Sequence, residues 1–305
     1  MKKYSPLFVT FALFCSQSVY SQTPVGYDFL RTSVGARPSA MGGAFVAIAG
    51  DIHSVFYNPA GMSFIRERQG TLSYLNHLLD FQSGFLGYAH PLSKGTFGAA
   101  INFYDFGQFD GRDVNNEPTG DFGATGFVFS SGYSRQVVKN VSVGATGKYI
   151  RFQIDDFTQT AVALDAGVMI YLPSQRATVG ASVLNLGTTT SAFINSKDDL
   201  PVSLQFGASK TLEHLPLLIS ASLVKFQDDN LDFRVGGEMT LTEQLVVRLG
   251  YDSMGQDLKV NSNKDRFAGV SFGLGFKLNK FNVDYSLSSF GEVGSLNRVT
   301  LVGRF

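Results

Sequence analysis

The chain has 305 residues, enough for one large domain or two ordinary ones. Its formal net charge is 0 and charged residues make up 16%, below the roughly 25% of soluble domains, which argues against a nucleic-acid partner and an ordinary soluble domain. With 33 Gly, 28 Phe and a mean hydropathy of +0.06, the chain is too polar for a helical membrane protein but apolar enough for a membrane β-barrel.

Residues 1–21 are predicted to be a cleaved signal peptide. They carry two basic residues, an apolar core and small residues before the cleavage point: Lys2, Lys3, Leu7–Phe14, Val19 and Ser21. A membrane anchor is disfavoured because a spanning helix needs about 20 apolar residues, and a lipoprotein signal at Cys15 is disfavoured by the bulky Phe14 before it. Cleavage before Gln22 would remove the only cysteine, and with it any disulfide or thiolate metal site.

Residues 22–68 differ in composition and residue pattern from the rest of the chain. Small residues crowd the stretch 33–51, which has no clean alternation, and Ala40–Ala49 could form a short helix. Such a segment packs closely against other backbone, so we expect a plug, or hatch, inside a barrel. A periplasmic tail and a separate soluble subdomain are the alternatives.

A predicted turn follows within this segment, at the sequence Asn58-Pro59-Ala60-Gly61-Met62. Asn58 is expected to be extended because it precedes proline, and Gly61 would permit a positive φ. Upstream, Gly42 and Gly43 weaken any helix at that point.

From Gln69 to Phe305, strand-like runs follow one another without helical interruption. The predicted strands are 69–78, 81–91, 95–106, 121–137, 140–151, 158–172, 175–187, 201–211, 216–225, 231–241, 243–252, 266–278, 280–289 and 295–305. Bacterial single-chain barrels have an even number of strands, and most of these runs can cross a membrane with tilt. The predicted fold is therefore an all-β, 14-stranded antiparallel transmembrane outer-membrane β-barrel, residues 69–305, with an N-terminal plug.

The last two runs show the barrel pattern most clearly. Apolar residues alternate with polar ones at Phe281, Val283, Tyr285 and Leu287, then at Val299 and Leu301. A period of two places one face in an apolar medium and the other against polar groups. The chain ends on Phe305, which is predicted to be the C-terminal residue that serves barrel assembly, with the barrel-assembly machinery as a partner.

The connections between runs alternate in length. The longer ones are 107–120, 188–200 and 253–265, with more modest ones at 152–157, 226–230 and 290–294, whereas the intervening connections are short. Outer-membrane barrels have short periplasmic turns and longer external loops. The first connection, near Leu79–Asp80, is short where this rule expects a long one.

Eight charged residues are predicted to point into the lumen: Lys148, Asp165, Arg234, Glu238, Arg248, Asp284, Arg298 and Arg304. Buried charges need partners or water. We expect ion pairs that fill the barrel and hold the plug; a polar permeation path is the alternative.

No motif for catalysis or metal binding is present. The four histidines have no carboxylate or serine at motif spacing, and there is no phosphate-binding loop. The oxygen-rich stretches 110–113 and 228–232 lack the spacing of a calcium loop, so no catalytic residue, metal or cofactor is predicted.

Three N-terminal stretches resemble the PorV/PorQ family of outer-membrane proteins of the type IX secretion system, itself distantly similar to FadL transporters. They are Tyr27-Asp-Phe-Leu30, Gly35–Ala47 and Tyr57-Asn-Pro-Ala-Gly-Met62, and the segments Phe85–His90 and Gly95–Gly98 look more like the PorQ branch. The resemblance implies a fourteen-stranded barrel with a hatch and no catalytic residues. The positions that match the hatch pattern are Ala36, Arg37, Gly42, Gly43, Asn58, Pro59 and Gly61.

The expected function is a non-enzymatic accessory role in type IX protein secretion or cell-surface attachment. The implied partners are the outer-membrane bilayer, other secretion proteins and secreted cargo. The alternative is a FadL-like transporter of hydrophobic small molecules, for which a strand kink or a gap in the wall would argue. An outer-membrane phospholipase would need a nucleophile and a base at the barrel rim, and none is recognisable in the sequence.

Overall fold

The computed structural model describes residues 26–76, 81–193, 197–227, 229–258 and 263–305. The predicted signal peptide and the connection at Leu79–Asp80 lie outside these residues. Within them, no helix has the length and apolar character needed to cross a bilayer.

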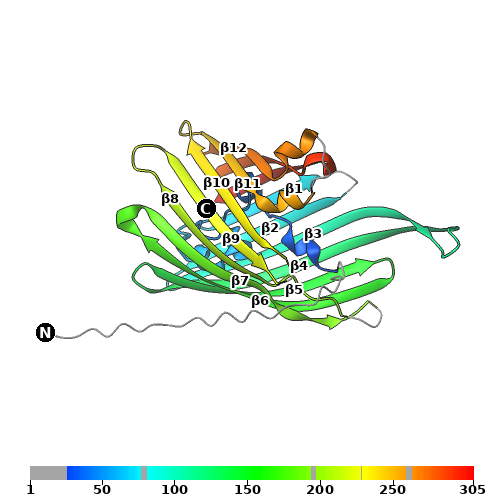
Figure 1. Cartoon of the computed structure of the whole chain (residues 1–305). Coiled ribbons are helices and arrows are strands. Elements are labelled where there is room, and N and C mark those ends of the chain that lie inside the picture. Colours follow the sequence, from blue (N-terminus) through cyan, green and yellow to red (C-terminus); the bar gives the residue numbers. More distant parts are fainter. Residues whose placement is uncertain (1–25, 77–80, 194–196, 228, 259–262) are drawn as a thin grey trace.

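The described residues form a closed antiparallel barrel of fourteen strands (Figure 1). The strands are β1 (Gln69–Asn76), β2 (Gln82–Leu92), β3 (Gly95–Arg112), β4 (Pro118–Val138), β5 (Val141–Ile154), β6 (Phe157–Leu172), β7 (Ala177–Ser191), β8 (Ser203–Thr211), β9 (Leu217–Phe226), β10 (Leu231–Thr240), β11 (Leu245–Asp252), β12 (Val270–Leu278), β13 (Phe281–Ser289) and β14 (Ser295–Arg304). Each pairs with its sequence neighbours, and β1 closes the barrel against β14 from Gln69↔Arg304 to Asn76↔Asn297. The predicted strand number and barrel closure are confirmed.

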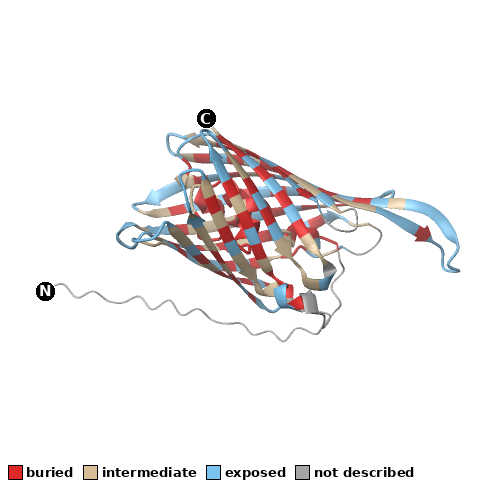
Figure 2. Cartoon of the chain, turned by 90° about the horizontal axis from the view of Figure 1, so that it is seen from above, coloured by how far each residue is buried: buried red, intermediate tan, exposed pale blue. Residues whose placement is uncertain are grey.

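The barrel is apolar outside and polar inside, the reverse of a soluble protein. In β3, Phe97 and Phe103 are exposed on the outer face, whereas Thr96 and Asn102 are buried on the inner face. The alternation of burial along the strands is visible around the wall in Figure 2. Because an outer surface of this kind is stable only in an apolar medium, the strands suit a lipid bilayer.

The hairpin of β3 and β4 extends beyond the rest of the barrel (Figures 1 and 2). Residues 107–120 were expected to be a loop, but β3 continues to Arg112 and β4 begins at Pro118. Beyond Phe109 and Phe122, whose rings stack 5.5 Å apart, both faces of the hairpin are mostly exposed. The predicted loop is therefore mostly strand, because its residues pair across the hairpin.

The other connections are short helical turns or irregular segments. The helical elements between strands are η3 (Pro173–Gln175), η4 (Ser253–Leu258), η5 (Asn263–Phe267) and η6 (Gly291–Val293). The connection at 152–157 is shorter than predicted, because β5 and β6 leave only Asp155 and Asp156 between them. Asp155 has a φ of +52°, a conformation typical of tight hairpin turns.

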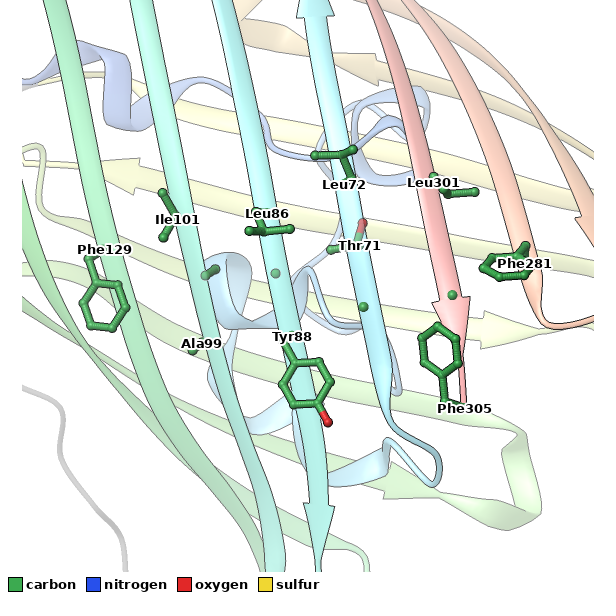
Figure 3. Close-up of a pocket in the computed structure, with 14 residues that line it drawn as sticks. Thr71, Leu72, Leu86, Tyr88, Ala99, Ile101, Phe129, Phe281, Leu301 and Phe305 are labelled. Atoms are coloured by element: carbon green, nitrogen blue, oxygen red, sulfur yellow. The ribbon is translucent and has the colours of Figure 1, made fainter.

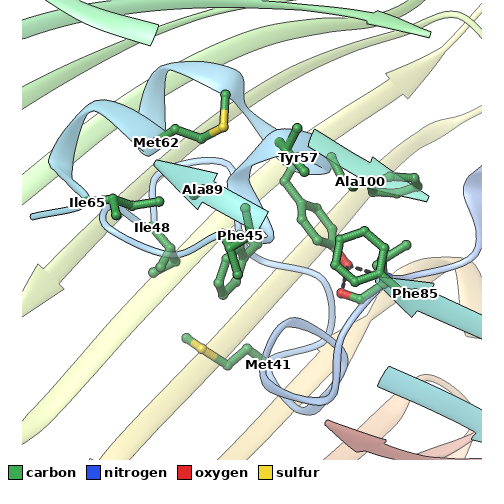
Figure 4. Close-up of a cluster of buried hydrophobic side chains, with 13 residues drawn as sticks. Met41, Phe45, Ile48, Tyr57, Met62, Ile65, Phe85, Ala89 and Ala100 are labelled. Atoms are coloured by element: carbon green, nitrogen blue, oxygen red, sulfur yellow. Dashed lines mark hydrogen bonds between the residues drawn. The ribbon is translucent and has the colours of Figure 1, made fainter. Parts of the chain in front are cut away.

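The N-terminal segment, residues 26–68, lies against the inner face of the barrel wall. It contains η1 (Asp28–Arg31), α1 (Ala36–Ala40), α2 (Ser54–Tyr57) and η2 (Pro59–Phe64). The prediction of a short helix over Ala40–Ala49 was wrong, because α1 ends at Ala40, and Gly42 and Gly43 follow with positive φ. Figure 4 shows its apolar core, in which Phe45, Tyr57 and Met62 pack near Phe85 of β2 and Ala100 of β3.

Candidate functional site

The contact between the N-terminal segment and the inner wall brings most of the sequence-predicted residues together. Arg37, the second residue of α1, donates from Nε and Nη2 to the two carboxylate oxygens of Glu238 on β10, each at 2.7 Å. Its Nη1 donates to Asp51 at 2.9 Å. Charge-assisted bonds in this forked geometry are among the strongest in proteins, so Arg37 ties the segment to the wall.

The same network continues along the wall. Arg248 of β11 donates to Glu238 and to Asp284 of β13, both at 2.6 Å. Two arginines and three carboxylates thus form one chain of ion pairs from Asp51 to Asp284. Such a network restricts the position of the segment, because moving it would leave buried charges unpaired.

Burial and partners act in opposite directions on the pKa values of Arg37 and Asp51. Burial alone would lower the pKa of Arg37, but Glu238 and Asp51 outweigh it and raise the pKa above its ordinary value. Burial would also raise the pKa of Asp51, but His53, followed by Arg37, holds the pKa of that carboxyl below its usual range. The His53 Nδ1 atom lies 2.7 Å from the Asp51 carboxylate.

A second ion pair stands apart from this network. Lys148 Nζ of β5 lies 2.7 Å from Asp165 of β6 and donates to the side-chain oxygen of Asn185 at 2.8 Å. Asn185 sits at an irregularity in the register of β6 and β7, with φ of +59°, and its backbone N–H donates to Asp165 at 2.7 Å. The buried pair therefore lies beside the register shift between Leu164 and Ala166, one of the two places where β7 departs from regular pairing with β6.

Asn58 joins three parts of the interior. Its amide nitrogen donates to the carbonyls of Val46, at 2.8 Å, and of Val168 on β6, at 3.2 Å, and its amide oxygen accepts from Ala60 N at 3.1 Å. The wall has glycines where this turn approaches it: a Cβ at Gly144 would lie 2.5 Å from the Pro59 carbonyl carbon, and one at Gly167 would lie 2.0 Å from Asn58 Oδ1. The turn at Asn58 and Pro59 therefore requires wall residues without a side chain where it approaches β5 and β6.

Gly61 is required for a different reason from the one predicted. Its φ is not among the positive values, so the prediction of a positive φ was wrong. A Cβ at Gly61 would lie 2.6 Å from Ser54 Oγ and 3.0 Å from the Ile48 carbonyl oxygen. The residue is small because the turn is crowded.

Gly42 is required for two reasons, a positive φ and a lack of space for a side chain. Its φ is +61°, and a Cβ there would lie 2.5 Å from the backbone nitrogen of Tyr251 on β11. The neighbouring Gly43 also has positive φ, at +72°, and Ala36, fully buried, donates its N–H to Thr300 Oγ1 of β14 at 2.8 Å. Backbone of the segment and backbone of the wall thus meet directly.

The remaining two predicted lumen arginines of the central wall, Arg234 and Arg298, line a separate cavity of about 360 Å³ between the N-terminal segment and the ends of β10–β14. Arg234 Nε lies 3.0 Å from Asp252. Arg298 donates to Ser39 Oγ. Arg304, at the end of β14, is only partly buried and lies outside this cavity.

The C-terminal Phe305 lies on the outer wall. Its ring covers Gly303 of β14 and meets Phe281 edge to face at 6.2 Å, and its backbone exchanges hydrogen bonds with Arg68. It borders an apolar outer groove of about 460 Å³ that crosses β14, β1, β2 and β3, with Leu72, Leu86 and Leu301 among its lining residues (Figure 3). The role of Phe305 in assembly stays a prediction.

Sequence reasoning missed the partners of the predicted residues. Asp51 contacts the predicted Arg37, Ser39 contacts the predicted Arg298, and His53 contacts Asp51. Inward glycines such as Gly144 and Gly167 face the Asn58-Pro59 turn. Glycine at an inward position of a strand was the available signal, since it marks close approach of another backbone. Among the described residues, no three His, Cys, Asp or Glu gather in a way that could hold a metal ion.

The closed fourteen-stranded barrel, with its apolar outer face and polar inner face, defines a membrane β-barrel. The chain matches the family model of the type IX secretion system membrane protein PorP/SprF over residues 39–289, and it therefore belongs to that family. The finer resemblance to PorV/PorQ is not confirmed by this match. A comparison with curated protein sequences gives no match.

Solved structures with a similar fold include transporters of the hydrocarbon toluene. The toluene transporter TbuX of Ralstonia pickettii has a TM-score of 0.61 at 13% identity, covering 89% of this chain and 98% of that one. The toluene transporter TodX of Pseudomonas putida has a TM-score of 0.60 at 13% identity, covering 89% of this chain and 98% of that one. A FadL homologue of Pseudomonas aeruginosa has a TM-score of 0.54 at 14% identity, covering 86% and 95%. At these identities the likeness concerns the fold alone.

Proposed function

We propose that the protein is a non-enzymatic outer-membrane component of type IX secretion that binds other secretion proteins or cargo at its external rim. The match to the PorP/SprF family carries this proposal. In it, the N-terminal segment acts as a plug that is fixed by the Arg37 network, so the barrel works as a platform and not as an open pore. The even-to-odd strand connections, which are short, face the periplasm.

The projecting β3–β4 hairpin is the proposed docking element. Its tip is pre-ordered: the Asp113 carboxylate accepts hydrogen bonds from the backbone N–H groups of Asn115, at 2.8 Å, and Glu117, at 2.9 Å. Val114 at the tip is fully exposed. A rigid element that exposes an apolar side chain loses little entropy on binding, which favours a protein partner.

The test shortens the hairpin without disturbing its register. Replacing residues 110–121 by Asn-Gly joins the paired Phe109 and Phe122 through a two-residue turn. We expect the shortened protein to reach the membrane and migrate as a folded, heat-modifiable barrel, but to lose its partners in a crosslinked pull-down and to reduce secretion. Glu213→Ala, in the exposed β8–β9 connection at the opposite end, is the control and should keep both activities. Unchanged pull-down and secretion would remove the hairpin from the proposal.

Uptake of a hydrophobic small molecule is the second candidate function. The similar folds of TbuX and TodX, both described as toluene transporters, and the irregularity at Asn185 in β7 favour it. In this structure the Lys148–Asp165 pair fills that irregularity. Proteoliposomes that take up toluene faster than empty liposomes, with Lys148→Met faster still, would support transport; equal rates in all three would reject it.

A further inference from the structure

The cavity between the N-terminal segment and the ends of β10–β14 holds a charge that the secretion role does not use. The cavity measures about 360 Å³, near the lower end of small-molecule sites. It is lined by hydroxyl groups from both sides, namely Thr32, Ser33 and Ser39 of the segment and Ser271, Ser288 and Ser289 of the wall.

Arg298 differs from the other buried basic residues of the strands. In the described part of the chain these are Lys148, Arg234, Arg248 and Arg298. Lys148 pairs with Asp165, Arg234 with Asp252 and Arg248 with Glu238 and Asp284. Arg298 is only 4% exposed, and no carboxylate of the described residues pairs with it.

The guanidinium of Arg298 has hydrogen-bonding capacity to spare. Its Nη1 donates to Ser39 Oγ, whereas its Nη2 is buried and has no partner among the described residues. Burying a cation without a counter-charge is costly, so a buried arginine is normally paired. Arg298 therefore gives the cavity that it lines a buried positive charge without a carboxylate partner among the described residues, and a buried hydrogen-bond donor that is unused.

The charges around the cavity agree with an anionic occupant. Its lining holds three arginines, Arg31, Arg234 and Arg298, against two carboxylates, Asp28 and Asp252. Asp28 lies 3.2 Å from Arg31 and Asp252 lies 3.0 Å from Arg234, so both acids are paired. The remaining positive charge is that of Arg298.

We infer that this cavity is a binding site for a small anion, a carboxylate or phosphate group, held by the Arg298 guanidinium and the surrounding hydroxyls. The planar fork of arginine matches both groups and donates to their oxygens in parallel. Met254 and Leu296 in the lining give room for a short apolar body beside the charged end. The site is independent of the secretion role and would exist under either proposed function.

The test measures binding to the purified full-length barrel in detergent by isothermal titration, in a buffer without competing anions. The probes are benzoate as a carboxylate, inorganic phosphate as a phosphate and benzyl alcohol as a neutral control. We expect benzoate or phosphate to bind and benzyl alcohol to bind much more weakly. Binding of benzoate alone identifies a carboxylate site, and binding of phosphate alone identifies a phosphate site.

Arg298→Met removes the charge and keeps an unbranched, apolar side chain at this position. We expect it to bind the anion about tenfold more weakly or worse, because a charge-assisted hydrogen bond is lost. We also expect it to melt at the same or a higher temperature than the unliganded wild type, since an unpaired buried charge is gone. Arg248→Met is the matched control. It removes the partner of Glu238 and Asp284, so its melting temperature should be lower than that of the wild type.

Two results would overturn the inference. One is a wild-type barrel that binds neither anion. The other is an Arg298→Met barrel that is folded, as judged by heat-modifiable migration, and binds the anion as tightly as the wild type.

Discussion

At the scale of single residues, Arg37 has the largest consequence, because one side chain serves two carboxylates. Its guanidinium binds Glu238 through both oxygens and also reaches Asp51. The sequence placed Arg37 in a hatch motif, but it did not identify either partner. The ion pair with Glu238 spans 201 positions of sequence, and no local pattern encodes such a separation.

Arg37→Met should release the N-terminal segment from the wall. Removing one partner of a buried ion pair typically costs about 3–5 kcal/mol, because a buried charge is left uncompensated. Unfolding in urea, followed by heat-modifiable migration, measures the loss. Arg66→Met, an exposed arginine of the same segment, should change stability by less than about 0.5 kcal/mol. Equal effects of the two substitutions would show that the network does not hold the segment.

Gly42→Ala should be far more damaging than a comparable glycine substitution elsewhere. Gly42 has a φ of +61° and its missing Cβ faces the Tyr251 backbone, so alanine adds both strain and a clash, together about 3 kcal/mol. Gly120 on the projecting hairpin also has positive φ, at +105°, but nothing lies within 4 Å of its Cβ position.

Gly120→Ala is therefore the matched control, with an expected cost of about 1 kcal/mol from strain alone. The melting temperatures of the two variants in the same detergent give the comparison. If the melting temperature of Gly42→Ala is no lower than that of Gly120→Ala, the backbone contact with Tyr251 is not tight in solution.

At the scale of elements, the N-terminal segment depends on protonation through Asp51. The pKa of Asp51 is held below its ordinary value, mainly by His53 and Arg37 against the effect of burial. A group with a depressed pKa stabilises the fold above its unfolded pKa of about 3.9 and loses that contribution only as the pH falls through the folded value.

The segment should therefore stay protected from pepsin at pH 4 and become sensitive only at lower pH. Asp51→Asn should be digested at pH 4, because its stabilising charge is absent from the start. Asp113→Asn is the control: its carboxyl also has a lowered pKa, from backbone N–H groups of Glu117 and Asn115, but it lies on the hairpin tip. Digestion of the wild-type segment already at pH 4 would contradict the depressed pKa of Asp51.

The strands themselves were the most predictable elements. All fourteen overlap their predicted spans, because the period of two is a local property of each run. The errors fall at strand ends, as at β3 and β4, where pairing between Arg112 and Pro118 prolongs both strands past the point where hydrophobic alternation ends. The polar residues at these strand ends were predicted to be a loop, because no pattern within the sequence indicates that two polar segments pair with each other.

At the scale of the whole molecule, the proposed plug decides whether the barrel conducts ions. Fully buried side chains such as Met41, Phe45 and Ile52 occupy the interior beside the wall. Deleting residues 27–66 should therefore produce a large, steady conductance in planar bilayers, whereas the wild type should conduct little or nothing. A low conductance from a correctly folded deletion variant would show that wall side chains, and not the segment, close the lumen.

The sequence by itself determined the wall of this protein: an all-β chain, fourteen strands, an apolar outer face and a polar inner face. These features follow from alternation within single strands, which is set by neighbours two positions apart. Only the tertiary structure decided how the interior is filled. Which carboxylate meets Arg37, which glycines receive Asn58 and Pro59, and that Arg298 has no acidic partner depend on closing the barrel around its own N-terminal segment, which joins residues more than 100 positions apart.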